Sequence, residues 1–417
     1  MRLNFCNMLI KNIKSLVQIE EQPRDRVCGT GMGRLNTLEN AWLLLEGGII
    51  SDFGPMADVP QSACGAEIDA SGRFVLPSFC DGHTHLVYAG SREQEFIDKV
   101  NGLSYQEIAK RGGGILHSME LLAQTSQEEL FEQSILRAQE IIAKGTGAVE
   151  IKSGYGPDLE SELKMLRVAK RIGRETPLEV KTTFLGAHAV PRAYANNKEA
   201  YVQELIRRYI PEIASEGLAD YIDVFCEQGF FSTEDTDRIL NAGIKYGLIP
   251  KVHANQLSFS GGVQVGVKYG AISVDHLESS DTEEFEVLKN SKTMPVVLPG
   301  ASFFLNMQYA PAKKMIDYGL PVALASNYNP GSCPSGDMKF MMSLACIYMK
   351  LNTQQVINAA TLNGASAMGL SQSHGSIAKG KTANLFITQA LPSLDFIPYT
   401  FNSQIIHTII LKGKIIS

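Results

Sequence analysis

Five of the eight histidines in this chain stand where short apolar runs give way to polar residues: His83, His85, His188, His253 and His276. His83 and His85, in the segment FVLPSFCDGHTH, are two positions apart, so on a strand their side chains point to the same face. Two imidazoles on one face can share a metal ion, and His253, in IPKVHANQ, would supply a third neutral nitrogen. Three such ligands leave one coordination position open for water, so the pattern predicts a catalytic metal site.

Each of these histidines also has a purely structural explanation. A lone histidine at a strand end is most often a satisfied core or surface residue, so His188 or His276 alone would carry little weight. An isolated HTH segment is weak for the same reason. The metal interpretation depends on the whole pattern, in which the HxH and the other histidines stand at strand ends within a rhythm of eight strands. The histidines at positions 374 and 407 lie off that pattern, and His117 is ambiguous.

Other polar residues stand in similar positions and could bind a substrate. Arg92 follows the HxH, and its guanidinium can bind a carboxylate through two hydrogen bonds, although a surface salt bridge explains it equally well. Tyr155 lies in KSGYGP, where the glycines allow close approach of a ligand. Residues 329–332, NPGS, offer backbone amides and a hydroxyl to a polar group. Ordinary turns are the alternative for both segments.

Eight short apolar runs position these residues, and they end near residues 85, 156, 188, 228, 256, 278, 300 and 331. Helical patterns fill most of the gaps; the one beginning at Ser126 opens with a capping box to Glu129 and closes on Gly145. Alternating strands and helices predict parallel strands, and eight units over roughly 290 residues fit an α/β fold of the (β/α)₈ TIM-like barrel type. An open doubly wound sheet is the alternative, but it explains less well why polar clusters follow almost every strand.

The two flanks of this region have a different pattern. Residues 1–73 include AWLLLEGGIISDFG, and residues 371–417 include GKTANLFIT and IIHTIILKGKIIS, which predict strands without long helices. We expect the two flanks to form one small β-domain beside a barrel spanning residues 74–370. The first crossover of the barrel is about 60 residues long, a length typical of a lid or a substrate loop.

Composition limits the class of protein. Hydrophobic residues are 44% and charged residues 20% of 417, which is ordinary for a globular protein. The net charge of −6 argues against nucleic acid or an anionic membrane surface as the main partner. The seven cysteines form no CxxC pair and suit reduced thiols. Because no run approaches the ~20 apolar residues of a membrane span, we expect a cytoplasmic protein.

Several segments also carry a family resemblance. PSFCDGHTHLVYAGSREQEF resembles the metal-binding opening of the amidohydrolase superfamily. The segments LSYQEIAKRGGGI, VEIKSGYGPDLESELKMLRV, TTFLGAHAVP, IDVFCEQGFFS, VDHLE and NPGSCPSG resemble the imidazolonepropionase family within it. The resemblance spans about residues 70–415. It implies hydrolysis of the cyclic amide of 4-imidazolone-5-propanoate to N-formimino-L-glutamate in histidine degradation, with one zinc or iron ion. The partner implied is thus a small molecule that carries a carboxylate.

The resemblance also implies roles for individual residues, matched by position. The metal ligands would be His83, His85, His253 and, at the position of the family's aspartate, Asn327. The residues that bind substrate would be Arg92, Tyr105, Tyr155, His188, Gln256, Asn329, Gly331 and Ser332. The catalytic residues would be His276, Gln256 and Asn327.

Two of these positions depart from what the family's chemistry needs. An amide such as Asn327 can offer its carbonyl oxygen to a metal, but it is neutral and cannot act as a base. Gln256 is also neutral, where some members of the family have glutamate. General base catalysis contributes ~10²–10⁴-fold, so a loss in that range is expected unless His276 takes over part of the proton transfer.

Three hypotheses follow for the function. The first is a metal-dependent imidazolone hydrolase, slower than its relatives, and the second is a binding or vestigial protein that keeps the pocket with little turnover. A different cyclic amidase is a third, and Arg92 with the GAHAVP segment argues against it. Homodimers are common among barrels of this kind, although no feature of the sequence indicates one.

Overall fold

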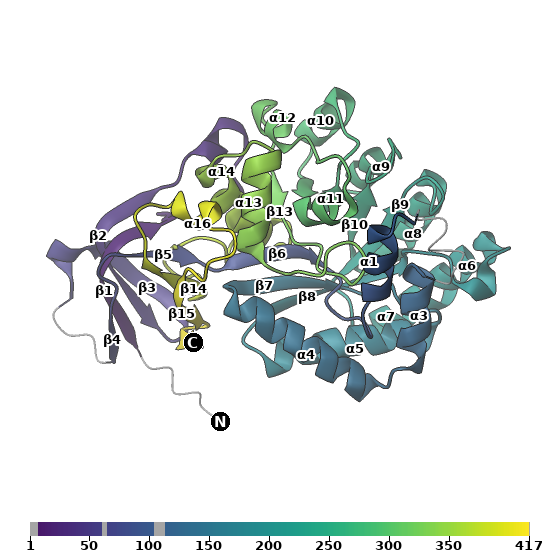
Figure 1. Cartoon of the computed structure of the whole chain (residues 1–417), viewed down its shortest axis with the longest axis horizontal. Helices are drawn as coiled ribbons and strands as arrows, with labels where there is room; N and C mark the ends of the chain where they lie inside the picture. The colour runs from purple at the N-terminus through teal and green to yellow at the C-terminus, as the bar shows by residue number, and fades with distance from the viewer. Residues whose placement is uncertain (1–6, 61–64, 104–112, 417) are drawn as a thin grey trace.

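The computed structural model describes residues 7–60, 65–103 and 113–416, and it contains two sheets (Figure 1). The first is a sheet of eight parallel strands that follow one another in chain order. They are β6 (Phe79–Thr84), β7 (Thr146–Lys152), β8 (Glu179–Ala187), β9 (Tyr221–Cys226), β10 (Ile249–Ala254), β11 (Ser273–His276), β12 (Met294–Val297) and β13 (Ala323–Leu324). Most of their residues are buried, as is typical of parallel strands covered on both faces.

The sheet closes on itself between its first and last strands. The backbone N–H of Asn327 donates to the carbonyl of His83 at 3.0 Å, and the N–H of His85 donates to Tyr328 at 2.9 Å. The strand β13 is only two residues long, and Asn327 has a φ of +58°, which ends the extended conformation before the NPGS turn. The predicted (β/α)₈ barrel with a separate sheet is confirmed.

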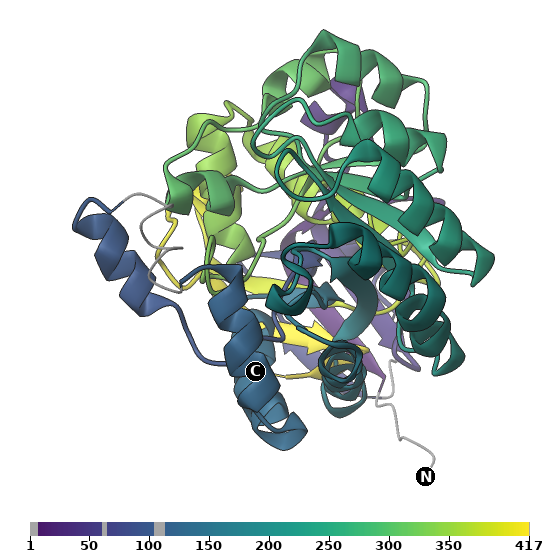
Figure 2. The same ribbon diagram turned by 90° about the vertical axis from the view of Figure 1, so that its right-hand side faces the viewer.

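Helices surround the barrel, as the view from the end of the molecule opposite the second sheet shows (Figure 2). Those between β6 and β10 are α1 (Glu93–Val100), α3 (Ile115–Gln124), α4 (Gln127–Ala143), α5 (Leu159–Glu175), α6 (Lys198–Glu204), α7 (Ile210–Ser215) and α8 (Thr233–Lys245). Those that follow β10 are α9 (Gly262–Lys268), α10 (Thr282–Lys289), α11 (Pro299–Leu305), α12 (Ala312–Asp317), α13 (Met338–Tyr348), α14 (Thr353–Ala360) and α15 (Leu362–Ser366). The capping box of Ser126 and Glu129 is present at the start of α4, as predicted.

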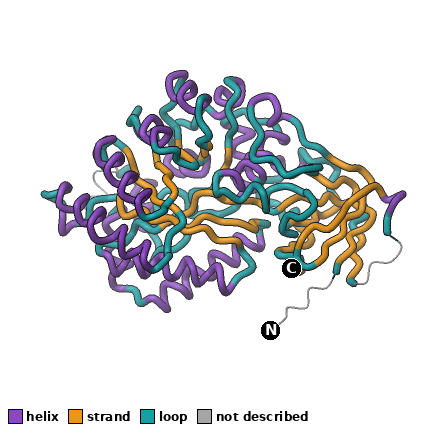
Figure 3. Tube along the Cα trace, turned by 180° about the vertical axis from the view of Figure 1, so that it is seen from behind, coloured by secondary structure: helices purple, strands orange, loops and turns teal. Residues whose placement is uncertain are grey.

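The second sheet joins the two ends of the chain at one end of the molecule (Figure 3). Its strands are β1 (Met8–Val17), β2 (Thr37–Glu46), β3 (Ile49–Pro55), β4 (Ala66–Asp69), β5 (Arg73–Pro77), β14 (Leu385–Ala390), β15 (Ile406–Leu411) and β16 (Lys414–Ile415). The link between the N- and C-terminal strands is the antiparallel pair β5 and β14. A short helix, α16 (Phe396–Tyr399), lies between β14 and β15.

The segment FVLPSFCDGHTH, which we expected to be one strand, divides into β5 and β6. The N–H of Ser78 donates to Asn384 of the second sheet, whereas the N–H of Phe79 donates to Gly145 of the barrel, at 3.0 and 2.9 Å. Pro77 and Ser78 stand at the boundary, but a local pattern does not show which distant segment a strand pairs with, and for this reason the division was not predicted.

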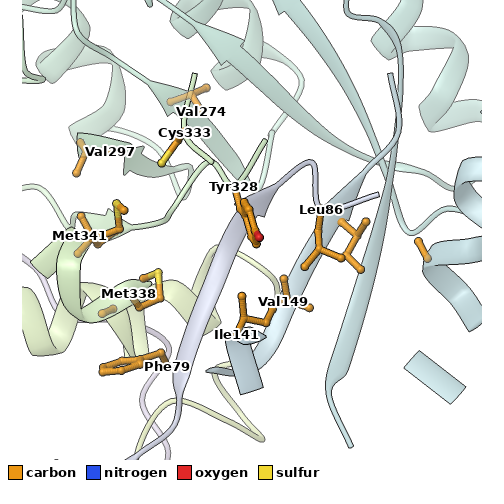
Figure 4. Packing of buried hydrophobic residues seen from close by; sticks show 14 of the residues in the cluster. Phe79, Leu86, Ile141, Val149, Val274, Val297, Tyr328, Cys333, Met338 and Met341 are labelled. Carbon is orange, nitrogen blue, oxygen red and sulfur yellow. The ribbon is translucent and has the colours of Figure 1, made fainter. Parts of the chain in front are cut away.

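One large hydrophobic cluster lies between the barrel and its helices. Figure 4 shows part of it, with Tyr328 among Leu86, Ile141 and Val149. A smaller cluster fills the second sheet and includes Ile10, Leu43 and Ile410. No helix in the described ranges has the length and apolarity that crossing a membrane requires.

Candidate active site

A cavity of about 550 Å³ opens at the carboxyl ends of the barrel strands. This is the face on which such barrels carry their active sites. Eleven of the predicted site residues line it: His85, Arg92, Tyr155, His188, His253, Gln256, His276, Asn327, Asn329, Gly331 and Ser332. The side chain of His83 is fully buried and is not part of the lining, and Tyr105 lies outside the described residues.

The three histidines predicted to bind a metal form one cluster. One ring nitrogen from each of His83, His85 and His253 lies within 4.8 Å of the other two. His83 lies in β6 and His85 directly follows it. His253 lies in β10, the fifth of the eight strands and so across the barrel from the first. Nε2 of His83 is buried and has no hydrogen-bond partner among the described residues. Such an orphaned nitrogen fits a metal ligand, because a buried polar atom without a partner is otherwise costly.

Carboxylates behind two of these rings fix their orientation. Nδ1 of His83 bonds Oδ2 of Asp275 at 2.6 Å, and Nδ1 of His253 lies 2.9 Å from Oδ2 of Asp223. Metal-binding histidines commonly place their second nitrogen against a carboxylate in this way, which leaves Nε2 free for the ion. The donor set therefore fits a metal ion.

A buried lysine holds the two carboxylates together. Nζ of Lys152, at the end of β7, lies 2.8 Å from Asp223, 3.5 Å from Asp275 and 2.6 Å from Glu150. Burial alone would lower the pKa of Lys152, but the three carboxylates together raise it above its usual value. Lys152 therefore stays charged and balances the acids beneath the histidine cluster.

The histidines themselves are held neutral. Burial, together with neighbouring charged groups, lowers the pKa of His83 and of His85 well below the usual value for histidine. Burial also lowers the pKa of His253, although Asp223 acts in the opposite direction. A neutral imidazole is the form that binds a metal, so the site is prepared for an ion without losing protons first.

Arg92 stands at the start of α1, next to the NPGS turn. Its Nε and Nη2 bind both carboxylate oxygens of Glu95, at 2.9 and 2.6 Å. A Cβ on Gly331 would lie 2.1 Å from Nη1 of Arg92, so a side chain at that position would displace the guanidinium. Nζ of Lys99, about two turns further along α1, lies 3.4 Å from the carbonyl of Gly331, and Lys99 also lines the cavity. Two cations thus share one wall of the cavity.

Tyr155 and His188 form another part of the lining. The ring of His188 stacks on that of His85, with centroids 5.0 Å apart and planes at 14°. Nδ1 of His188 lies 3.2 Å from the carbonyl of Gly154, and the ring of Tyr155 lies 5.6 Å from that of His188. The buried carboxylate of Glu162 accepts from the N–H groups of Gly154 and Gly156 and so fixes the loop that carries Tyr155.

Asn327 lies in a network of amides and hydroxyls. Nδ2 of Asn329 donates to Oδ1 of Asn327 at 3.1 Å and to Oγ of Ser332 at 2.7 Å. Oδ1 of Asn329 accepts from the N–H groups of Gly331 and Ser332, both at 2.8 Å. None of the described residues that line the cavity is an aspartate or a glutamate. The absence of an acid, predicted at positions 256 and 327, therefore holds for all the described lining residues, whose charged members are the cations Arg92 and Lys99.

Several functional residues were not predicted from the sequence. They include the charged residues beneath the cluster and several other lining residues: Asp223, Asp275, Lys152, Lys99, Phe225, Phe230 and Phe304. A signal existed for the two aspartates, because YIDVFC and ISVDHL each place one acid inside an apolar strand. A buried acid in such a run needs a partner, and the sequence does not show which one it has.

Comparison with known proteins agrees with this geometry. A family model described as "Amidohydrolase family" matches residues 194–416. The imidazolonepropionase of Flavobacterium johnsoniae is 54% identical over 408 residues, which are 98% of this chain and 99% of that protein. The chain belongs to the imidazolonepropionases of the amidohydrolase family. The imidazolonepropionase of Alkaliphilus oremlandii is 39% identical over 411 residues, 98% of this chain and 97% of that protein.

Solved structures of other enzymes share the fold at low sequence identity. The 5-methylcytosine deaminase of Klebsiella pneumoniae, liganded with 5-fluorocytosine, has a TM-score of 0.74 at 18% identity and covers 98% of this chain and 97% of its own. Atrazine chlorohydrolase from Arthrobacter aurescens, complexed with zinc, has a TM-score of 0.71 at 12% identity, covering 98% and 94%. At such identities the likeness shows the barrel alone.

We predict that acid destabilises the fold through His188. Burial, followed by the effect of His253, lowers the pKa of His188 from 6.5 to about 3. Below pH 6.5 the unfolded chain therefore binds a proton that the folded chain does not bind until about pH 3. The free energy of unfolding should fall as the pH falls through this range. Urea unfolding of metal-free protein at several pH values measures the slope, which should be shallower in His188→Gln; an equal slope in the variant would contradict this assignment.

Proposed function

We propose that the protein hydrolyses the cyclic amide of 4-imidazolone-5-propanoate to N-formimino-L-glutamate. The observation that supports this most is one cavity that is lined by two histidines of the three-histidine cluster and that also has a wall with two cations. The first group suits hydrolysis of an amide, and the second suits a substrate that carries a carboxylate. The names of the relatives give the same reaction, and they favour turnover over the binding-only hypothesis.

The metal is proposed to be a single zinc or iron ion held by His83, His85 and His253, with Oδ1 of Asn327 as a further neutral donor. When bound, such an ion acidifies water and polarises a carbonyl oxygen. Metal dependence is typical of the amidohydrolase family. Imidazole ligands suit both zinc and iron, so the donor set does not separate the two.

The remaining residues bind and orient the substrate. Arg92 and Lys99 are proposed to hold the propanoate carboxylate, with Arg92 fixed in position by Glu95. Asn329, Gly331 and Ser332 keep the turn beside Arg92 in shape. Tyr155 and His188 are proposed to contact the imidazolone ring, together with Gln256.

Proton transfer falls to His276 in this scheme. Asn327 and Gln256 are amides and cannot accept a proton. His276 lines the same cavity, and its ring lies 5.4 Å from that of His253, so it reaches the region of the metal site. We propose that its imidazole accepts the proton of the attacking water and returns it to the ring nitrogen that leaves.

The direct test is to incubate metal-loaded protein with 4-imidazolone-5-propanoate and identify the product by mass spectrometry. The expected product has gained one water, and chelated protein should not form it. A substrate analogue without the carboxylate should be hydrolysed poorly. Formation of a different product, or equal hydrolysis of the analogue, would contradict the assigned substrate.

Replacing Arg92 with glutamine should weaken substrate binding more than it slows turnover. A charge-assisted hydrogen bond contributes about 1.5–3 kcal/mol, so KM should rise by about 10- to 100-fold. Steady-state kinetics measures the two constants separately. Arg238→Gln is the matched control, since Arg238 pairs bidentately with Glu199 on the outside of the barrel and should leave both constants unchanged. A fall in kcat alone would contradict a binding role for Arg92.

We further propose that the enzyme acts in the cytoplasm, where free cysteines stay reduced. Cys28, Cys80, Cys226, Cys333 and Cys346 are all unpaired in the structure. Reduced thiols of this kind are typical of proteins that remain in that compartment.

A further inference from the structure

The end of β11 has an unusual backbone. His276 and Leu277 have φ values of +90° and +67°, a region that residues other than glycine seldom adopt. The two residues are held there by bonds to the neighbouring strand, since Leu277 donates to Ala254 at 3.1 Å and Ser279 donates to Asn255 at 2.8 Å. Strain of this kind persists only where the surroundings impose it.

The strain changes the direction of one side chain. On a regular strand, neighbouring residues point to opposite faces, so Asp275, which contacts His83, would leave His276 pointing out of the barrel. In the structure, Asp275 is buried beneath the histidine cluster and His276 lines the cavity. The positive φ therefore brings two consecutive side chains to the same interior.

Glu278 lies directly behind the ring of His276. Its side chain is 1% exposed, and Oε1 is 3.3 Å from Nδ1 of His276 and 3.4 Å from Oγ of Ser302. Its backbone carbonyl accepts from Nε2 of Gln308 at 2.9 Å, which fixes the segment. The other oxygen, Oε2, has no hydrogen-bond partner in the described part of the chain.

The surroundings of Glu278 differ from those of the three acids beneath the histidine cluster. Asp223 and Asp275 share Lys152, and Glu150 contacts both Lys152 and Lys251. Among the described residues, the one ion-pair partner of Glu278 is His276. A buried carboxylate without a lysine or an arginine is costly, so its position beside His276 requires a reason.

We propose that Glu278 is a positioning residue for His276: it accepts a hydrogen bond from Nδ1–H and so directs Nε2 toward the cavity. This inference rests on the proposed function and deepens it. A carboxylate that fixes the tautomer of a histidine is a general device for presenting the other ring nitrogen to a substrate. Glu278 thus provides, through His276, a carboxylate beside a cavity whose wall has neutral amides at positions 256 and 327.

The kinetic test uses Glu278→Gln and Glu278→Ala with metal-loaded protein. Replacing such an orienting partner typically costs 10–100-fold, so kcat should fall by about that factor in Glu278→Ala, with KM within about threefold of the original. Glu284→Gln is the matched control, because Glu284 is an equally buried acid. It lies on α10, accepts a hydrogen bond from the backbone N–H of Asp281, and has no hydrogen bond or ion pair with a histidine among the described residues. Unchanged kcat in Glu278→Ala would overturn the proposal.

A double-mutant cycle with His276 separates positioning from a structural role. If Glu278 acts through His276, the variant His276→Ala with Glu278→Ala should be no slower than His276→Ala alone, within about threefold. Losses that multiply would show that Glu278 acts independently, which would overturn the proposal.

A second readout does not need turnover. In ¹⁵N-labelled protein, His276 should be the Nδ1–H tautomer, identified by the signal that disappears in His276→Ala, and Glu278→Ala should convert it to a mixture. An unchanged tautomer would overturn the proposal even if the kinetics changed. Because this measurement uses no substrate, it also tests Glu278 if the protein does not hydrolyse 4-imidazolone-5-propanoate, so failure of the proposed function and failure of this inference are distinguishable.

Discussion

Replacing Asn327 with aspartate should raise kcat by about 10²- to 10⁴-fold, the usual contribution of a positioned general base. The exchange keeps the shape of the side chain. Oδ1 can still accept from Nδ2 of Asn329, and the weak contact of Nδ2 with Ser332, 3.5 Å long, can be replaced by a hydrogen bond from the hydroxyl. Since Asn327 lines the cavity and is bonded to the backbone of His83, the new carboxylate would stand beside the histidine cluster.

Steady-state hydrolysis by metal-loaded Asn327→Asp measures this gain. Asn329→Asp is the matched control, because it changes the same kind of side chain in the same turn. Nδ2 of Asn329 donates to Asn327 and Ser332, so its loss should lower activity instead of raising it. If kcat does not rise in Asn327→Asp, the lack of a base at this position does not limit the rate of hydrolysis, and the role assigned to residue 327 is wrong.

Replacing Lys152 with methionine should destabilise the fold by about 3–5 kcal/mol, the usual effect of removing one partner from a buried ion pair. The side chains of Lys152, Asp223, Asp275 and Glu150 are fully buried, so the acids would lose their cation with no access to solvent. Urea unfolding of metal-free protein gives the change in free energy without a contribution from metal binding.

Lys170→Met is the control for this prediction. Nζ of Lys170 lies 3.3 Å from Asp220, and its side chain is 28% exposed. Removing such a partly exposed pair should cost less than about 1 kcal/mol. Equal effects of the two substitutions would mean that the lysine beneath the cluster is not what balances its acids.

The barrel could be predicted because its signals are local. Each strand is a short apolar run followed by polar residues, and the ends of β6, β8, β10 and β11 were each marked by a histidine. The boundary between the two sheets could not be predicted, because Pro77 and Ser78 stand where β5 ends and β6 begins without showing that the two strands pair with different sheets. Pairing between distant segments leaves no trace in a local pattern.

The candidate site divides in the same way. The histidine cluster was predicted from spacing and strand ends, and the neutral wall from Asn327 and Gln256. The pairing of Asp275 with His83 and of Asp223 with His253 joins residues 192 and 30 positions apart, and no spacing rule relates them. The role proposed for Glu278 depends on two positive φ values, which a histidine and a leucine do not suggest in a sequence.

Hydrolysis of 4-imidazolone-5-propanoate by the unmodified, metal-loaded protein tests the central claim most directly. We expect N-formimino-L-glutamate to form at a rate that depends on the metal and is abolished in His253→Ala, which removes one of the three clustered imidazoles. Calorimetry on the same sample would measure binding of the substrate separately. Binding without any product, in protein shown to contain its metal, would contradict the account and identify the chain as a binding protein on an amidohydrolase barrel.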